Sequence, residues 1–311
     1  FCPTVIATYE QREEGYPYLW DIKTQLLEEE AIIVLSWGGS LDPLWEPFAK
    51  HHLVYFMKGQ DFGDQIPPHV PIISNCQYLM AKAQQEWPHN VQYYLPEALE
   101  ENCNNQGLDR QIDVLFIQRK QDPYIINHLV PALKENGLRV HVQTEFLPAE
   151  ELYGLYQNAK VYLYAFAPMR TDLHPSGYRW MEGSATQTLE AMACGCQVMS
   201  NFRGGMVDFL EPPLHGHKLT AYHLQWDVAQ VCREVNAFTK EAAQQRAEHI
   251  QYKYSAERYA QRLETLIEGL NFFFDFSKTQ KFSDDFFTDY RPLKAWDRCK
   301  NWLYRLKRKW Q

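Results

Sequence analysis

Short β-branched and apolar runs alternate along the chain with longer segments of helical periodicity, and this alternation restricts the fold more than any other feature. Repeated strand–helix–strand units predict an α/β fold with parallel sheets and crossover helices. The predicted strands are Val5–Thr8, Ala31–Ser36, Leu53–Met57, Val70–Ser74 and Val91–Leu95, then Ile112–Ile117, Leu138–Val142, Val161–Phe166 and Gln197–Ser200. The predicted helices are Tyr78–Trp87, Tyr124–Glu135, Pro148–Asn158, a segment that starts at Ser184, and residues 226–271.

The two series of strands are separated by a polar stretch, Glu100–Gly107, which is typical of a linker. We therefore expect a first domain at residues 1–105, a second at 106–275, and an aromatic and basic tail at 276–311. The first domain is shorter than a nucleotide-binding α/β domain usually is. Because the sequence starts without methionine and with a strand in progress, we expect this N-terminal domain to be incomplete.

Composition indicates a globular chain: of 311 residues, 45% are hydrophobic and 23% are charged. No uncharged apolar run approaches the roughly 18 residues that a membrane helix needs, and the N-terminus does not resemble a signal peptide. Seven cysteines are scattered without a CxxC pair, which indicates neither a metal site nor a disulfide framework. We expect a reducing, cytoplasmic compartment.

The segment around residues 182–190 has the pattern of an anion site at a helix start. Ser184 and Gln187 have the spacing of a capping box, and Gly183 allows a ligand close to the backbone. The N–H groups of Ala185 and Thr186 would then point at a diphosphate. Glu182 and Glu190 would bracket it and suit the hydroxyls of a sugar and a ribose. The alternative is that the two are an ordinary loop acid and helix acid.

The spacing Glu182-x7-Glu190, followed by Ala-Met-Ala-Cys-Gly-Cys at residues 191–196, resembles the signature of the retaining GT-B transferases called glycosyltransferase family 4. The resemblance covers roughly residues 1–275 and implies two Rossmann-like domains that face a cleft. It implies that the first Glu contacts the donor sugar and the second the ribose. It also implies transfer with retention of anomeric configuration, with no covalent nucleophile, bound metal or cofactor.

Further positions carry the same resemblance. Arg119 matches the family's donor-phosphate arginine, with Lys120 as a second cation, and Gly204-Gly205 matches a glycine turn near the donor. Three departures from the pattern are Ser184-Ala185 in place of Phe-Gly, Gln197 in place of Pro, and the missing lysine after Arg119. The short N-terminal domain and the missing lysine favour an alternative in which the chain is a catalytically inactive GT-B relative that acts as a binding or scaffold subunit; the intact Glu182 and Glu190 pair opposes it.

Two other features suggest contacts with substrates or membranes. His174 precedes Glu182 in a segment with Arg170 and Arg179, which could contact donor phosphate or acceptor; the alternative is an ordinary ordered loop.

The tail at 291–311 holds eight Lys or Arg and one Asp, although the whole chain has a net charge of −8. An acidic body does not favour nucleic acid. In the tail, apolar residues recur at helical spacing between the basic ones, which favours peripheral binding to the inner face of a membrane; the alternative is a helix packed on the protein. The expected partners are therefore a nucleotide-sugar donor and a saccharide or lipid-linked acceptor of cell-surface or exopolysaccharide type. The apolar tail residues are Leu293, Trp296, Leu303, Leu306 and Trp310.

Overall fold

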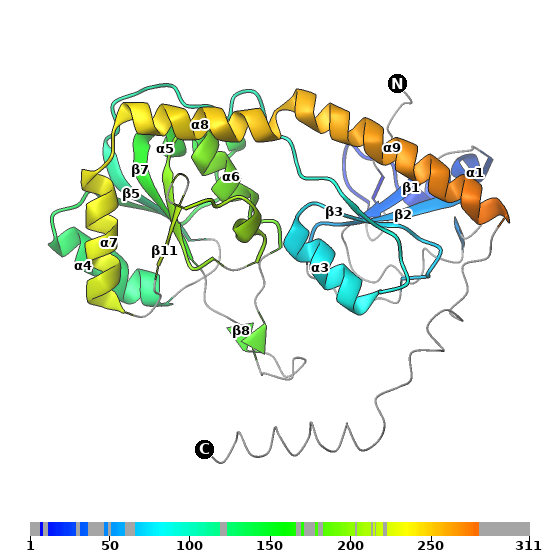
Figure 1. Cartoon of the computed structure of the whole chain (residues 1–311), viewed down its shortest axis with the longest axis horizontal. Coiled ribbons are helices and arrows are strands. Elements are labelled where there is room, and N and C mark those ends of the chain that lie inside the picture. Colours follow the sequence, from blue (N-terminus) through cyan, green and yellow to red (C-terminus); the bar gives the residue numbers. More distant parts are fainter. Residues whose placement is uncertain are drawn as a thin grey trace, which may run out of the picture.

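The structure is a computed structural model, and its helices and strands form two parallel sheets flanked by helices (Figure 1). This arrangement confirms the predicted α/β class. The described residues are 7–8, 12–28, 32–36, 47–48, 51–59, 66–118, 123–165, 169–170, 178–179, 183–202, 204–212, 214, 216–219 and 223–279.

The first sheet holds four parallel strands in sequential order, β1 (Ile32–Ser36), β2 (His52–Met57), β3 (Ile72–Ser74) and β4 (Gln92–Tyr94). Alternate side chains of its strands enter two cores, as the pleat requires. Leu53 and Ile72 belong to the core that includes Leu79 of α3 (Gln77–Glu86) and Leu19 of α1 (Leu19–Glu28). The predicted strand Val5–Thr8 lies mostly outside the described residues; its last residue, Thr8, forms an isolated bridge with Tyr18.

The second sheet is also parallel, with the order β11-β10-β7-β5-β6. One face packs against α5, α6 and α8, and the other against α4 and α7. The strands are β5 (Ile112–Ile117), β6 (Val140–Gln143), β7 (Ala159–Tyr164), β10 (Gln197–Ser200) and β11 (Gly216–Lys218). The helices are η1, a π-helix (Ile125–Leu129), then α4 (Val130–Glu135), α5 (Ala149–Asn158), α6 (Thr186–Ala193), α7 (Leu224–Asn236) and α8 (Lys240–Tyr254).

The predicted helical stretch 226–271 is three helices, not one. The first break separates α7 from α8. Thr239 caps the start of α8, because its Oγ1 accepts a hydrogen bond from the N–H of Ala242. Ser255 separates α8 from α9 (Ala256–Thr279), and its Oγ accepts from the N–H of Arg258. Side-chain caps of this kind satisfy the free amides of a new first turn, so they divide the stretch.

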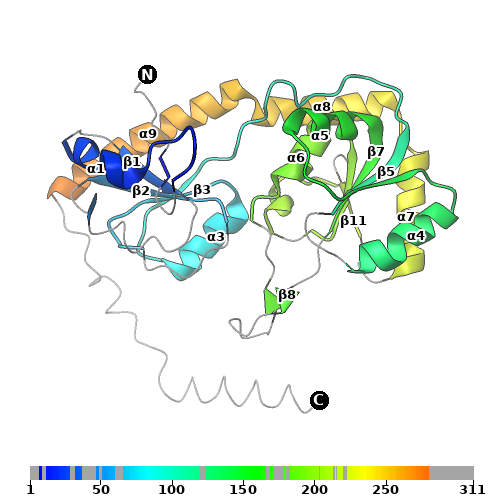
Figure 2. The same ribbon diagram turned by 180° about the vertical axis from the view of Figure 1, so that it is seen from behind.

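Helix α9 belongs by packing to the first sheet rather than the second. Its Leu266, Leu270 and Phe274 form a core with Val54 of β2 and Ile73 of β3. Figures 1 and 2 show α8 over the second sheet and α9 over the first. The helix pair therefore crosses from the second half of the molecule, built on the second sheet, to the first half, built on the first sheet. The domain boundaries at residues 105 and 275 stay predictions.

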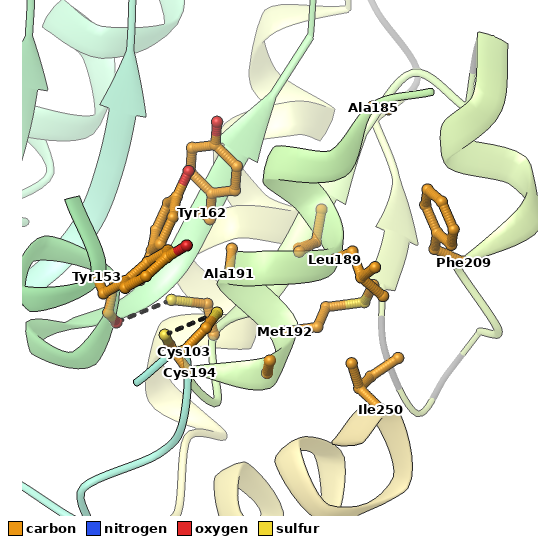
Figure 3. Close-up of a cluster of buried hydrophobic side chains, with 14 of the residues drawn as sticks. Cys103, Tyr153, Tyr162, Ala185, Leu189, Ala191, Met192, Cys194, Phe209 and Ile250 are labelled. Atoms are coloured by element: carbon orange, nitrogen blue, oxygen red, sulfur yellow. Dashed lines mark hydrogen bonds between the residues drawn. The ribbon is translucent and has the colours of Figure 1, made fainter. Parts of the chain in front are cut away.

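The predicted linker docks on the second half of the molecule. Cys103 lies beside the end of α6, with its Sγ 3.9 Å from that of Cys194 (Figure 3). Buried Arg110 donates hydrogen bonds to the carbonyl oxygens of Tyr156 at 2.9 Å and Cys194 at 2.6 Å. These contacts fix the path of the chain as it enters β5.

Asp113, near the start of β5, stabilises the second sheet through two ion pairs. Its carboxylate lies 3.0 Å from Arg139 and 2.8 Å from Lys160. Hydrogen bonds from Arg139, and then from Lys160, hold the pKa of Asp113 well below its usual value, although burial opposes them.

We expect Asp113→Asn to lower the free energy of unfolding by about 1–2 kcal/mol at pH 7, with the half-exposed Arg139 side chain limiting the effect. Because the folded pKa is depressed, this stability is full above the unfolded value of about 4 and is lost as pH falls toward the folded pKa. Urea unfolding of the parent protein and of Asp113→Asn, at pH 7 and at pH 3, measures the difference in stability. A difference of equal size at both pH values would contradict the ion-pair explanation.

Candidate functional site

The candidate site lies at the carboxyl edge of the second sheet. β5 precedes both β6 and β7, which lie on its two sides, so the strand order reverses between β5 and β7. In open α/β sheets, ligands bind outside the carboxyl ends of the strands at such a reversal. The residues that directly follow β5, β7 and β10 are therefore the ones placed to contact a ligand.

Helix α6 starts at this edge, but two residues later than predicted. It begins at Thr186, and Ala185 occupies the N-cap position with a left-handed backbone, φ 55°. The predicted capping box of Ser184 and Gln187 is therefore wrong: Ala185 intervenes, and it has no side-chain oxygen to cap the helix. A left-handed alanine costs roughly 1–2 kcal/mol, and such strain is concentrated at ligand sites.

Gly183, Gly204 and Gly205 come together beside the start of α6, and their role at the donor stays a prediction. The N–H of Gly205 donates to the carbonyl oxygen of Gly183 at 2.7 Å. A Cβ on Gly205 would overlap that oxygen and lie 2.9 Å from the Sγ of Cys76, and a Cβ on Gly183 would lie 2.9 Å from the carbonyl oxygen of Lys58. Only glycine fits at these two positions, because the backbone of Lys58 lies against Gly183 and both the Gly183 oxygen and the Sγ of Cys76 lie against Gly205.

Asp208, at the end of the short 3-10 helix η2 (Gly204–Asp208), stabilises the contact between the two halves. Its carboxylate accepts a hydrogen bond from the N–H of Gln77, the first residue of α3. Burial raises the pKa of Asp208, while hydrogen bonds from the backbone of Gln77 and Tyr78 oppose the shift. A carboxylate at a helix N-terminus also interacts favourably with the helix dipole.

A polar group on the first sheet lies next to this contact. Glu97, after β4, accepts from the Nδ2 of Asn75 at 3.1 Å and pairs with Lys58 at 3.5 Å. The Oδ1 of Asn75 is buried without a partner among the described residues. The carbonyl oxygen of Lys58 lies against Gly183, so this polar cluster of Lys58, Asn75 and Glu97 lies near the start of α6. The sequence did not single out these residues, although each closely follows a predicted strand.

Glu190 and Thr186 lie one turn apart on the least buried line of α6. Burial, together with the negative charge of Glu190, raises the pKa of the Tyr153 phenol, so the carboxylate lies near α5. Figure 3 shows Tyr153 beside α6 in the same core as Leu189 and Met192. The assignment of Glu190 to ribose binding stays a prediction.

The other predicted site residues, Glu182, Arg119, Lys120 and His174, lie outside the described residues, as does the tail at 291–311. Around His174, the backbone of β8 (Met169–Arg170) pairs with that of β9 (Tyr178–Arg179) in antiparallel fashion. Within the described ranges, no group of three or more His, Cys, Asp or Glu is arranged to hold a metal ion.

No family model matches the chain, and no curated protein matches it. Comparison of structures gives a clear result. Solved glycosyltransferases share this fold. A glycosyltransferase from Rickettsia africae is 7% identical, with a TM-score of 0.59, over 85% of this chain and 84% of its own.

Two further glycosyltransferase structures show the same similarity. The pneumococcal O-GlcNAc transferase GtfA, solved with UDP and GlcNAc, is 11% identical with a TM-score of 0.58, over 80% of this chain and 59% of its own. Anabaena HepE, solved with UDP-glucose, is 15% identical with a TM-score of 0.56, over 81% of this chain and 82% of its own. At such identities the likeness shows the fold, and the predicted GT-B architecture is confirmed.

Proposed function

We propose that this protein is a glycosyltransferase that moves a hexose from a nucleotide-sugar to a hydroxyl of a saccharide or lipid-linked acceptor. The observation that carries the proposal is the junction of Gly183, Gly205 and the start of α6 at the carboxyl edge of the second sheet. A helix N-terminus binds phosphate through its free amides and its dipole. The first sheet lies directly opposite, where an acceptor would have to enter.

The proposed roles follow the family resemblance. Glu182 orients the donor sugar, Glu190 binds the ribose, and the amides at Ser184–Thr186 cradle the diphosphate beside Gly204-Gly205. Arg119 and Lys120 stabilise the departing diphosphate, and His174 contacts donor phosphate or acceptor. In this scheme cationic side chains and the helix dipole stabilise the developing charge, so neither a metal nor a cofactor is required.

Two structural relatives favour UDP as the nucleotide. GtfA was solved with UDP and GlcNAc, and HepE with UDP-glucose. We propose retention of anomeric configuration and membership of glycosyltransferase family 4, both of which rest on the Glu182-x7-Glu190 spacing.

Membrane association is a separate part of the proposal. The basic tail at 291–311 would bind the inner face of a membrane and bring the site to a lipid-linked acceptor. Within the described part of the chain, every helix is too short or too polar to serve as a membrane span.

The proposal is tested by incubating the full chain with UDP-glucose and UDP-GlcNAc and a panel of saccharide acceptors. We expect release of UDP and a product whose anomeric proton, followed by NMR, has the α configuration of the donor. A β product would contradict retention. A folded protein that releases UDP from neither donor would favour the scaffold role over the enzyme.

Glu97 is expected to assist acceptor binding. Glu97→Gln should lower transfer to a saccharide acceptor roughly 10- to 100-fold relative to hydrolysis of the donor, because a charge-assisted hydrogen bond to an acceptor hydroxyl is lost. The ratio of saccharide product to free hexose measures this effect. Glu86→Gln, on the exposed end of α3, is the control. A parallel loss of both reactions in Glu97→Gln would show that the residue does not act on the acceptor.

A further inference from the structure

A groove of about 750 Å³ lies where α8 and α9 meet the edge strand of the first sheet. Its walls come from the end of β4, the last turn of α8 and the first half of α9. Figure 1 shows that this junction is the place where the helix pair crosses between the two halves of the molecule. None of the described residues assigned to the donor, Gly183 to Thr186, Glu190, Gly204 and Gly205, lines the groove.

The groove has a positive lining. Lys253, Arg258 and Arg262 line it, and none of the described residues that line it is an Asp or Glu. Lys253 is already paired with the carboxylate of Glu211, so the positive charge of the groove comes from the two arginines. Arg258 and Arg262 are one turn apart, so their like charges repel across one face of α9. Arg258 lies in the first turn of the helix, where the dipole also disfavours a cation. A bound anion would relieve both effects.

The charge of Arg262 is only partly compensated inside the protein. Its Nη2 donates to the carbonyl oxygen of Lys253 at 2.8 Å, and its guanidinium lies 5.8 Å from the centre of the Tyr254 ring. Its Nη1 is buried with no hydrogen-bond partner in the described structure. A buried donor without an acceptor is unfavourable and is uncommon in folded proteins, so this cation favours a ligand that carries negative charge.

The remaining surface of the groove suits a sugar ring. Tyr93, Tyr94 and Tyr252 supply aromatic surface, and the amide of Gln261 and the hydroxyl of Thr265 supply polar groups. The ring of Tyr93 is held in place, because its hydroxyl donates to the carbonyl oxygen of Gly269 at 2.8 Å. Apolar walls with a few placed polar groups are typical of small-ligand sites.

We propose that this groove binds an anionic saccharide, a sugar that carries a phosphate or carboxylate group. Arg258 and Arg262 would bind the anionic group, the tyrosine rings would contact the sugar, and Gln261 and Thr265 would bind its hydroxyls. This site is distinct from the donor site, and its existence does not depend on the proposed transferase activity.

The test is a ligand-observed NMR titration of the full chain with glucose 6-phosphate and glucuronic acid. Glucose and inorganic phosphate are the reference probes, and the titrations are repeated with saturating UDP. We expect both anionic sugars to bind with and without UDP, and each reference probe to bind at least about tenfold more weakly. Equal binding of glucose or of inorganic phosphate would overturn the proposal, as would displacement of the anionic sugars by UDP.

Variants locate the binding. Arg258→Gln and Arg262→Gln should each weaken binding of the anionic sugars roughly 10- to 100-fold, the loss expected for one charged hydrogen bond. Lys240→Gln removes a cation of α8 that pairs with Asp109 outside the groove, and it should have no effect. If Arg262→Gln does not fold, the binding of the anionic sugars to Arg258→Gln is the deciding measurement. Unchanged binding in Arg258→Gln would overturn the proposal, whatever UDP does at the donor site.

Discussion

Gly205→Ala is expected to destabilise the protein by about 1–3 kcal/mol and to weaken nucleotide binding at least tenfold. The new methyl group would overlap the carbonyl oxygen of Gly183 and crowd the Sγ of Cys76, and the Gly183 oxygen belongs to the backbone, which cannot rotate away. Relief would move the segment that leads into α6, and the proposed phosphate cradle with it. Thermal unfolding and a UDP titration measure the two effects.

Gly154→Ala is the matched control for this substitution. Gly154 lies inside α5, and nothing lies within 4 Å of a Cβ built on it. In a helix interior, alanine is more stable than glycine by roughly 0.5–1 kcal/mol, so this variant should be slightly more stable than the parent and bind UDP equally well. Normal UDP binding in Gly205→Ala would contradict the role of the glycine contact.

Glu182→Gln is expected to reduce kcat about 10²- to 10³-fold, the size of effect seen when one electrostatic contact to a transition state is removed. The free energy of unfolding should change by less than about 0.5 kcal/mol if the residue acts on the donor rather than on the fold. Steady-state rates of UDP release measure kcat, and urea unfolding measures the free energy of unfolding.

The control for Glu182→Gln is Glu151→Gln, an exposed carboxylate in the first turn of α5 that should leave both quantities unchanged. If Glu182→Gln lost activity and stability in proportion, its role would be structural, and the resemblance that assigned it to the donor sugar would be misleading.

Most strands could be predicted from the sequence because their apolar runs are long enough to be buried on both faces. Residues 112–117 illustrate this: Val114 and Phe116 enter one core of the second sheet and Leu115 the other. β11 was not predicted, because Gly-His-Lys has no apolar run and forms a strand only by pairing with β10.

The sequence predicted a site at the start of α6, but not the geometry of that segment. The family resemblance placed Gly183 and the Gly204-Gly205 pair near the donor, and these glycines lie together beside the start of α6. The left-handed backbone of Ala185 could not be predicted from alanine itself, because that conformation normally indicates glycine; only the glycine of the family pattern at this position points to it. The hydrogen bond from Gln77 to Asp208 joins residues far apart in the chain, and only the packing of the two sheets brings them together. For the same reason, the amphipathic pattern of α9 did not reveal which sheet it covers.

The most direct test of the central claim is a thermal-shift measurement with UDP, together with GDP and ADP, on the parent protein and on Glu190→Ala. At about 100 times its dissociation constant, a nucleotide that binds only the folded state adds roughly 2.7 kcal/mol of stability. We expect UDP to stabilise the parent protein and to have little effect on Glu190→Ala, with Glu248→Ala, another helix carboxylate, behaving like the parent. A folded parent protein that no nucleotide stabilises would contradict the donor site and favour a GT-B protein that acts as a scaffold.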